Sequence, residues 1–361
     1  MANFFQPEIN NKGKVMKIST IAKYVDQPVV LNGLQKKMPV LLIGGGSAFG
    51  LYDVYKHRKG KKSDEKRALK SAIVIGSTIA ASIIGTRGLK VGGKQIFEGL
   101  MENKPLKEIL KEQTAAVNKF IKNSGTKDKK VLSILEKSKK GKLKVKEIDT
   151  LIQKIPDSKH KNELFEVILP KPENVDSHEI FSEIKRLSLL GLVPVAGGIA
   201  GGLAADKITG SSSKKSVANK IKEGFYQYFA NIFLCNVGAG AALYGAEKLQ
   251  SAKIIKPLSP VKKMGVILAG ITTTGIVGGS FIANYLSKKI IDPLFGQKEK
   301  HKKLYDERKP EMLDIALHVD DIATAGVLSG LKWIEPALPF LYFISGYRAG
   351  IGYRNGEKHH H

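Results

Sequence analysis

The chain alternates between long apolar stretches and basic polar stretches. Six apolar runs stand out, at residues 38–55, 68–89, 187–205, 225–246, 264–286 and 322–352. The first five are close to the roughly 20 residues that a helix needs to cross a bilayer, and the sixth is long enough for a span plus an interfacial piece. None shows the polar face of an ordinary amphipathic helix. Lys, Arg, Tyr or Trp flank the runs, as in the interfacial anchors of membrane helices. The pattern predicts an all-α, multi-pass membrane protein; a soluble or peripheral helical protein is the alternative.

The six runs fall into three pairs, each joined by a basic loop, which predicts three membrane hairpins. The predicted divisions are an N-terminal polar segment 1–37, hairpins at 38–89, 186–246 and 247–355, and a tail 356–361. Because Lys and Arg are retained on the cytoplasmic side of a membrane, the dense basic clusters place the loops within each pair inside.

Residues 90–185 differ from the runs, since they are polar, rich in lysine and nearly free of long apolar stretches. Apolar residues recur at the helical period over 106–121, and the same spacing returns near 131, 148 and 164. We expect a small lysine-rich insert of about four amphipathic helices outside the membrane. Such helices bury their apolar stripes against one another; a position flat on the membrane surface is the alternative.

Small residues recur every four positions inside several runs. These predicted helix-packing residues are Gly197, Gly201, Gly275, Gly279, Gly326 and Gly330. Rows of this kind let the backbones of membrane helices approach closely. The segment GGIAGGLAADKITG, from residue 197 onward, resembles the glycine-zipper hairpins of several bacterial envelope proteins. The resemblance covers one or two runs and implies close helix packing without any activity.

Charge and cysteine content exclude several classes of protein. Lys and Arg number 59 against 33 Asp and Glu, a formal net charge of +26, and only seven of the 59 are Arg. Nucleic-acid readers favour Arg for bidentate contacts, so a lysine-rich surface predicts anionic lipid headgroups as partners and no nucleic acid. Simple solubility, or the coding bias of an AT-rich genome, is the alternative explanation of the lysines. The single cysteine, Cys235, excludes an intramolecular disulfide and a zinc site built on cysteines.

Two sets of residues are candidates for chemistry. Glu311, Asp314, His318 and Asp321 have the spacing of one helix face and could hold a divalent cation; a solvated acidic turn is the alternative. Polar residues within the apolar runs are candidates for an ion pathway, namely Asn231, Asn236, Asn284, Lys332 and Glu335. The alternative is that they lie at interfaces or hydrogen-bond between helices.

No signature of a nucleotide-binding loop, a zinc peptidase or a serine hydrolase occurs in the chain. The sequence therefore predicts a protein that is not an enzyme and has no cofactor. It favours a membrane assembly or scaffold element in a bacterial inner membrane, packing through small-residue faces and able to form homo-oligomers. A channel or transporter for a small ion or proton, using the polar residues inside the runs, is the alternative function.

Overall fold

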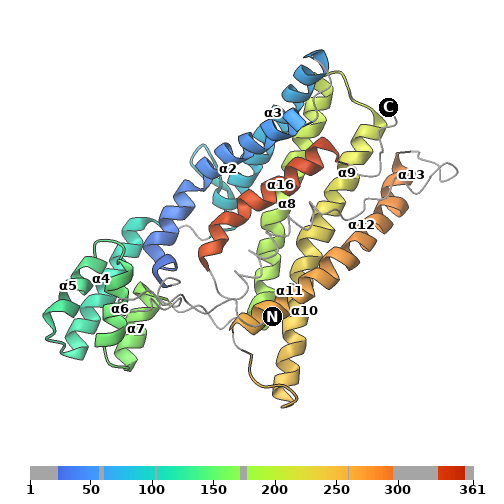
Figure 1. The fold of residues 1–361 in the computed structure, drawn as a ribbon. Coiled ribbons are helices and arrows are strands. Elements are labelled where there is room, and N and C mark those ends of the chain that lie inside the picture. The colour runs from blue at the N-terminus through green and yellow to red at the C-terminus, as the bar shows by residue number, and fades with distance from the viewer. Residues whose placement is uncertain are drawn as a thin grey trace, which may run out of the picture. The chain divides into compact units, whose positions relative to one another are not determined.

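The computed structural model describes residues 23–56, 61–101, 104–170, 177–258, 260–295 and 332–353, and 82% of these residues are helical. The described residues form two compact units. The first contains residues 23–35, 104–170 and 332–333, and the second contains most of the apolar helices (Figure 1).

The first unit is a bundle of short amphipathic helices. Its helices are α4 (Leu106–Ser124), α5 (Lys129–Ser138), α6 (Val145–Lys154) and α7 (Lys159–Ile168), together with the first turns of α2 (Pro28–Lys56). Asp128 caps α5 by accepting hydrogen bonds from two backbone N–H groups, and Ser158 caps α7 in the same way. Gly125 ends α4 in the left-handed conformation.

The core of this first unit is built from the apolar stripes of all four helices. Phe120, Leu135, Leu151 and Phe165 are buried together, each from a different helix. Gln27 joins the N-terminal residues to the bundle, since its amide both donates to the Leu143 carbonyl and accepts from the Leu143 N–H. The helical period seen in the insert thus produces helices that bury their stripes against one another.

The second unit contains longer helices with apolar surfaces. After the later part of α2 come α3 (Lys61–Arg87), α8 (Ser177–Ile208), α9 (Lys214–Tyr228), π-helix η1 (Phe229–Phe233), α10 (Leu234–Ser251), α11 (Pro260–Gly270), π-helix η2 (Ile271–Gly279), α12 (Ser280–Leu286), π-helix η3 (Ser287–Ile291), α13 (Asp292–Leu294), 3₁₀-helix η6 (Lys332–Ala337) and α16 (Leu338–Ile351). The helices α3 and α16 lie along α8, whereas α11 and η2 lie against α10 (Figure 1).

A β-hairpin departs from the predicted all-α fold. Strand β1 (Gly88–Val91) pairs antiparallel with β2 (Lys94–Glu98) directly after α3. Glycines at 88, 92 and 93 have positive φ, a conformation that favours glycine and allows a tight turn. The sequence pattern instead divides this segment between the first membrane hairpin, 38–89, and the helical insert, 90–185, because its alternation is too short to outweigh the surrounding helical pattern.

Four helical stretches among the described residues are long and apolar enough to cross a membrane. They are Glu65–Arg87, Glu183–Ile208, Lys214–Ser251 and Lys262–Leu294. They are consistent with a membrane protein. The first and last of the six predicted runs are not among them. In α2, three consecutive glycines and Asp53 lower the hydropathy, and α16 has only 14 residues.

Glycines allow α8 to lie against α3 on one side. A methyl group added to Gly197 would overlap Cβ of Ala81, and one added to Gly201 would lie 2.6 Å from Cβ of Ser77. These two glycines are four residues apart and face the same neighbour. Close approach of the two backbones therefore depends on the missing side chains.

A second pair of glycines lets the other side of α8 pack closely against α16. A methyl group on Gly198 would overlap the carbonyl oxygen of Gly346, and one on Gly202 would overlap that of Gly350. In the same way, Gly279 lies so close to η1 that an added methyl group would be 2.5 Å from Cα of Ala230. The small-residue faces described here are thus covered by helices of the same chain.

Candidate functional site

The pairing of α8 with α9 and η1 shows how far along the candidate membrane span of α8 the residues of α9 and η1 lie. A methyl group on Gly224 would lie 2.5 Å from Cδ1 of Ile199, and one on Gly191 would lie 2.8 Å from Cδ1 of Ile232. Later residues of α9 and η1 therefore face earlier residues of α8, so the helices are antiparallel. The midpoint of the candidate span in α8 is near Val195, and the residues between Gly224 and Ile232 lie at that depth.

A row of polar side chains runs along α9, η1 and α10 at this depth. The polar row consists of Lys220, Glu223, Gln227, Asn231 and Asn236, all buried. The Gln227 amide donates to the Glu223 carboxylate at 2.8 Å, and the Asn231 amide donates to the Gln227 side-chain oxygen at 2.9 Å. Glu223 and Gln227 are 0% exposed. The three central members thus form one hydrogen-bonded chain inside an apolar helix bundle.

The π-helix η1 keeps the row on one face of the helix. Steps of three or four residues connect Lys220 to Asn231, but the next step, to Asn236, is five residues. Within η1 the N–H of Leu234 donates to the carbonyl of Phe229, five residues earlier. This wider turn brings residues five apart nearer to the same face than an α-helix would. π-Helical turns are rare in proteins, and those that occur are often found at functional sites.

At the Asn236 end, the row approaches the start of the α8 span, where a cluster of charged residues lies. The Asn236 amide lies 3.4 Å from the Ser188 hydroxyl, to which it donates. Two residues earlier, Arg186 forms ion pairs with Glu183 and Glu335, each at 2.5 Å. Glu335 therefore lies in an ion pair at about the level of α8 that Asn236 reaches.

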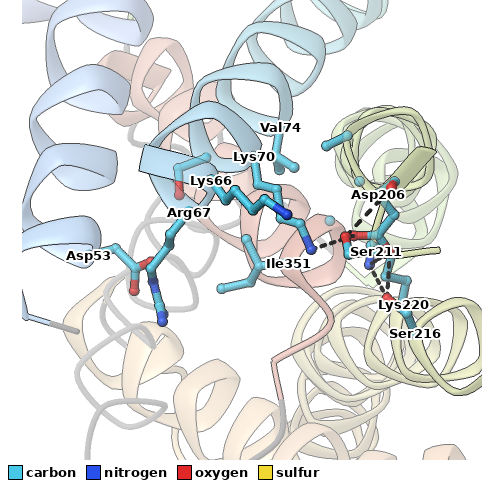
Figure 2. A pocket seen from close by; sticks show the side chains of 14 residues that line it. Asp53, Lys66, Arg67, Lys70, Val74, Asp206, Ser211, Ser216, Lys220 and Ile351 are labelled. Atoms are coloured by element: carbon cyan, nitrogen blue, oxygen red, sulfur yellow. Dashed lines mark hydrogen bonds and ion pairs between the residues drawn. The ribbon is translucent and has the colours of Figure 1, made fainter. Parts of the chain in front are cut away.

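At the opposite end, Lys220 joins the row to a buried carboxylate. The Lys220 ammonium lies 2.6 Å from Asp206, and both side chains are nearly fully buried. Asp206 also accepts from Ser216 at 2.5 Å and pairs with Lys70 of α3 at 2.9 Å. These residues line a cavity of about 360 Å³ between α2, α3, α8, α9 and α16 (Figure 2). The polar row thus extends between the levels of two charged clusters, one near each end of the α8 span.

A second buried ion pair lies beside the row. Lys222 of α9 pairs with Asp292 of α13, and their side chains are 5% and 4% exposed. Close by, the Ser280 hydroxyl donates to the Tyr226 hydroxyl at 3.2 Å. These contacts join the Lys214–Ser251 stretch to the Lys262–Leu294 stretch through polar groups.

The structure brings together two of the five residues predicted for an ion pathway. Asn231 and Asn236 belong to the polar row, and Glu335 contributes to the cluster at its end. Asn284 is half-buried on α12. Lys332 lies in η6, and its side chain is outside the described part.

The predicted metal ligands Glu311, Asp314, His318 and Asp321, and the predicted packing residues Gly326 and Gly330, all lie outside the described residues. Within the residues that the structure does describe, no three His, Cys, Asp or Glu side chains lie close enough together to hold a metal ion.

Sequence reasoning missed Lys220, Glu223 and Gln227, the first three members of the row. Lys220 and Glu223 precede the fourth run, 225–246, because charged residues lower the hydropathy there, and Gln227 lies inside that run. The signal was present as polar residues at spacings of three, four and four, running from Lys220 to Asn231. That spacing places them on one helix face.

No family model, no curated protein and no solved structure matches this chain. The function is therefore argued from the geometry of the polar row and of the cavity at its end.

Proposed function

We propose that this protein is a multi-pass membrane protein that moves a small cation or a proton along the polar row. The observation that carries the proposal is the buried carboxylate of Glu223, hydrogen-bonded to Gln227 near the middle of a candidate membrane span. Carboxylates and side-chain amide oxygens are groups that accept protons or bind small cations. Ionisable groups at membrane depth are costly, and they mark ion pathways and proton relays.

The extent of the row also supports a pathway. Asn236 lies 16 residues after Lys220, so at a rise of about 1.5 Å per residue the row covers roughly 24 Å of helix. This is most of the roughly 30 Å hydrocarbon thickness of a bilayer. Packing alone would not require hydrogen-bonding groups over this length, because small apolar side chains hold membrane helices together well.

The proposed topology has six spans in three hairpins, in the inner membrane of a bacterium. Two additional spans are required, in α2 and in the last run. The support from α2 is its outer surface, where Val40 and Leu51 are each 71% exposed and Leu41 and Ile43 are more than half exposed. Large exposed side chains of this kind suit contact with lipid tails and are unusual on a surface in water.

A membrane assembly or scaffold element is the second candidate, and open glycines favour it. Gly44, Gly245 and Gly278 would meet no atom within 4 Å if a methyl group were added, so a helix of another protein or of a second copy could approach there. The glycines at 197, 201, 275 and 279 are already covered within the chain. In either function, the absence of enzyme activity stays a prediction.

Flux into liposomes tests the proposal. We expect the reconstituted protein to carry protons or alkali cations, measured with a pH-sensitive dye and with ion-sensitive dyes. Glu223→Gln keeps the size of the side chain and removes its charge, and it should lower the flux at least tenfold. The matched control is Glu98→Gln, the same change at an exposed position of β2, which should leave the flux unchanged.

Two results would contradict translocation along the row. One is wild-type liposomes that show no flux above empty ones for protons and alkali cations. The other is equal flux in Glu223→Gln and wild type, which would remove the row from the pathway. A thermal denaturation curve of each variant in detergent separates lost transport from lost folding. Asn236→Ala provides a second, uncharged change in the same row.

A further inference from the structure

We infer that the cavity at the end of the polar row binds a phosphomonoester dianion, either the headgroup of a lipid or soluble phosphate. The six charged residues that line the cavity are Asp53, Lys66, Arg67, Lys70, Asp206 and Lys220 (Figure 2). The inference does not depend on ion movement, because Lys66 and Arg67 lie outside the row.

The lining has an excess of two positive charges. Four of its side chains are cationic and two are carboxylates. Asp206 accepts hydrogen bonds from Lys220 and Ser216 and pairs with Lys70. A phosphate monoester carries close to two negative charges near neutral pH, which matches the remaining charge. A carboxylate or a phosphodiester would leave about one positive charge uncompensated.

The donors that remain are of the kind that bind phosphate. Lys66 has no ion-pair or hydrogen-bond partner among the described residues, and in Figure 2 its side chain leaves α3 in the same direction as Lys70. Arg67 lies 3.7 Å from Asp53, while its Nε is buried and has no hydrogen-bond partner in the described part of the chain. A guanidinium group presents paired N–H donors that fit two phosphate oxygens.

Asp53 is held by Tyr347 through Oδ2, the same carboxylate oxygen that faces Arg67. The Tyr347 hydroxyl donates to Asp53 at 3.1 Å and is hydrogen-bonded to Ser71 at 3.0 Å. The carboxylate therefore holds the Arg67 guanidinium at the edge of the cavity. Arg67 stays partly open to the cavity, since its side chain is 35% exposed.

The size and position of the cavity also fit this ligand. Its volume of about 360 Å³ is at the lower end of the range of about 300–1,000 Å³ for small-molecule sites. It lies where the candidate span Glu65–Arg87 begins and the candidate span Glu183–Ile208 ends. These two ends are joined by the Lys70–Asp206 pair. In a bilayer this is the level of lipid headgroups, where basic side chains attract anionic lipids.

Titration of the full-length protein in detergent tests the inference. Isothermal titration calorimetry should show binding of inorganic phosphate that chloride at equal ionic strength does not reproduce. Lys66→Gln and Arg67→Lys should each raise the Kd about tenfold, because each removes a charge-assisted hydrogen bond. The matched control is Lys90→Gln, the loss of an exposed lysine on β1, which should leave the Kd unchanged.

Nanodiscs distinguish the two sources of phosphate. Retention of phosphatidic acid over phosphatidylcholine, lost in Lys66→Gln and kept in Lys90→Gln, would identify a lipid headgroup. Binding of inorganic phosphate without such retention would identify a soluble ligand. The inference is overturned if neither phosphate nor phosphatidic acid binds. It is also overturned if Lys66→Gln and Lys90→Gln weaken binding equally, since this would indicate only the diffuse positive charge of the protein.

Discussion

The close contact between α8 and α3 allows a quantitative test of the packing. A methyl group on Gly197 would overlap the methyl group of Ala81 and would lie 3.2 Å from the Ser77 carbonyl oxygen. Inserting a methyl group into a well-packed site costs about 1–3 kcal/mol. Because the obstacle lies on a helix backbone and cannot rotate away, we expect Gly197→Ala to lower the free energy of unfolding by an amount in this range.

Moving the methyl group from one helix to the other should restore the fit. Ala81→Gly alone should cost about 1 kcal/mol in helix propensity. In the double variant Gly197→Ala/Ala81→Gly, the gain of alanine in α8 offsets its loss in α3, and one methyl group again lies between the backbones. The double variant should therefore be more stable than the sum of the single changes by about 1–3 kcal/mol, the size of coupling seen between residues in contact.

Unfolding in detergent micelles by added SDS, followed by circular dichroism, measures these differences. Gly76→Ala on α3 is the matched control, since an added methyl group there would meet no atom within 4 Å; it should not lower stability. Strict additivity of the two single changes would refute the reasoning. It would mean that Gly197 and Ala81 are not in contact in the folded protein.

Two further predictions concern membrane insertion and acid sensitivity. The protein should stay in the membrane pellet after alkaline carbonate extraction, and recovery as a monodisperse species in detergent-free buffer would contradict the membrane assignment. In the first unit, hydrogen bonds from Lys154 and Lys119 lower the pKa values of Asp128 and Glu163. Their stabilisation is thus present above the unfolded pKa of about 4 and is lost as the pH falls through the lower folded values. Amide protection factors of α5, corrected for intrinsic exchange, should fall below about pH 4. The Asp128→Asn variant should lose the part of this dependence that comes from Asp128, and unchanged wild-type protection would contradict the prediction.

The predominance of helix could be predicted from the sequence, because long apolar runs are visible there whether the folded protein buries them or exposes them. The amphipathic helices of residues 104–170 could also be predicted from their apolar spacing. The β-hairpin at 88–98 was missed, since its two short strands depend on turn geometry at Gly92 and Gly93 more than on hydrophobic pattern. The placement of α16 beside α8 was also not predictable, since it results from tertiary contacts between glycines far apart in the chain.

Part of the candidate site was visible in the sequence and part was not. Asn231 and Asn236 were identified because polar residues inside an apolar run are conspicuous. Glu223 was missed because its neighbours Lys220 and Lys222 suggest a solvated helix end. Their burial depends on Asp206 and Asp292, which come from other helices and neutralise the two lysines. Composition along one segment does not contain that information.

The glycine contacts between α8 and α16 also bear on the order of events during synthesis. One side of α8 is matched by α3, which is made earlier, but the side formed by Gly198 and Gly202 is matched by Gly346 and Gly350, close to the end of the chain. At about 5–20 residues per second, translation reaches α16 on the order of ten seconds after α8. During that interval the face of α8 formed by Gly198 and Gly202 lacks its partner α16. Ribosome stalling or premature termination before residue 338 would leave this face exposed to insertion factors and quality-control proteases.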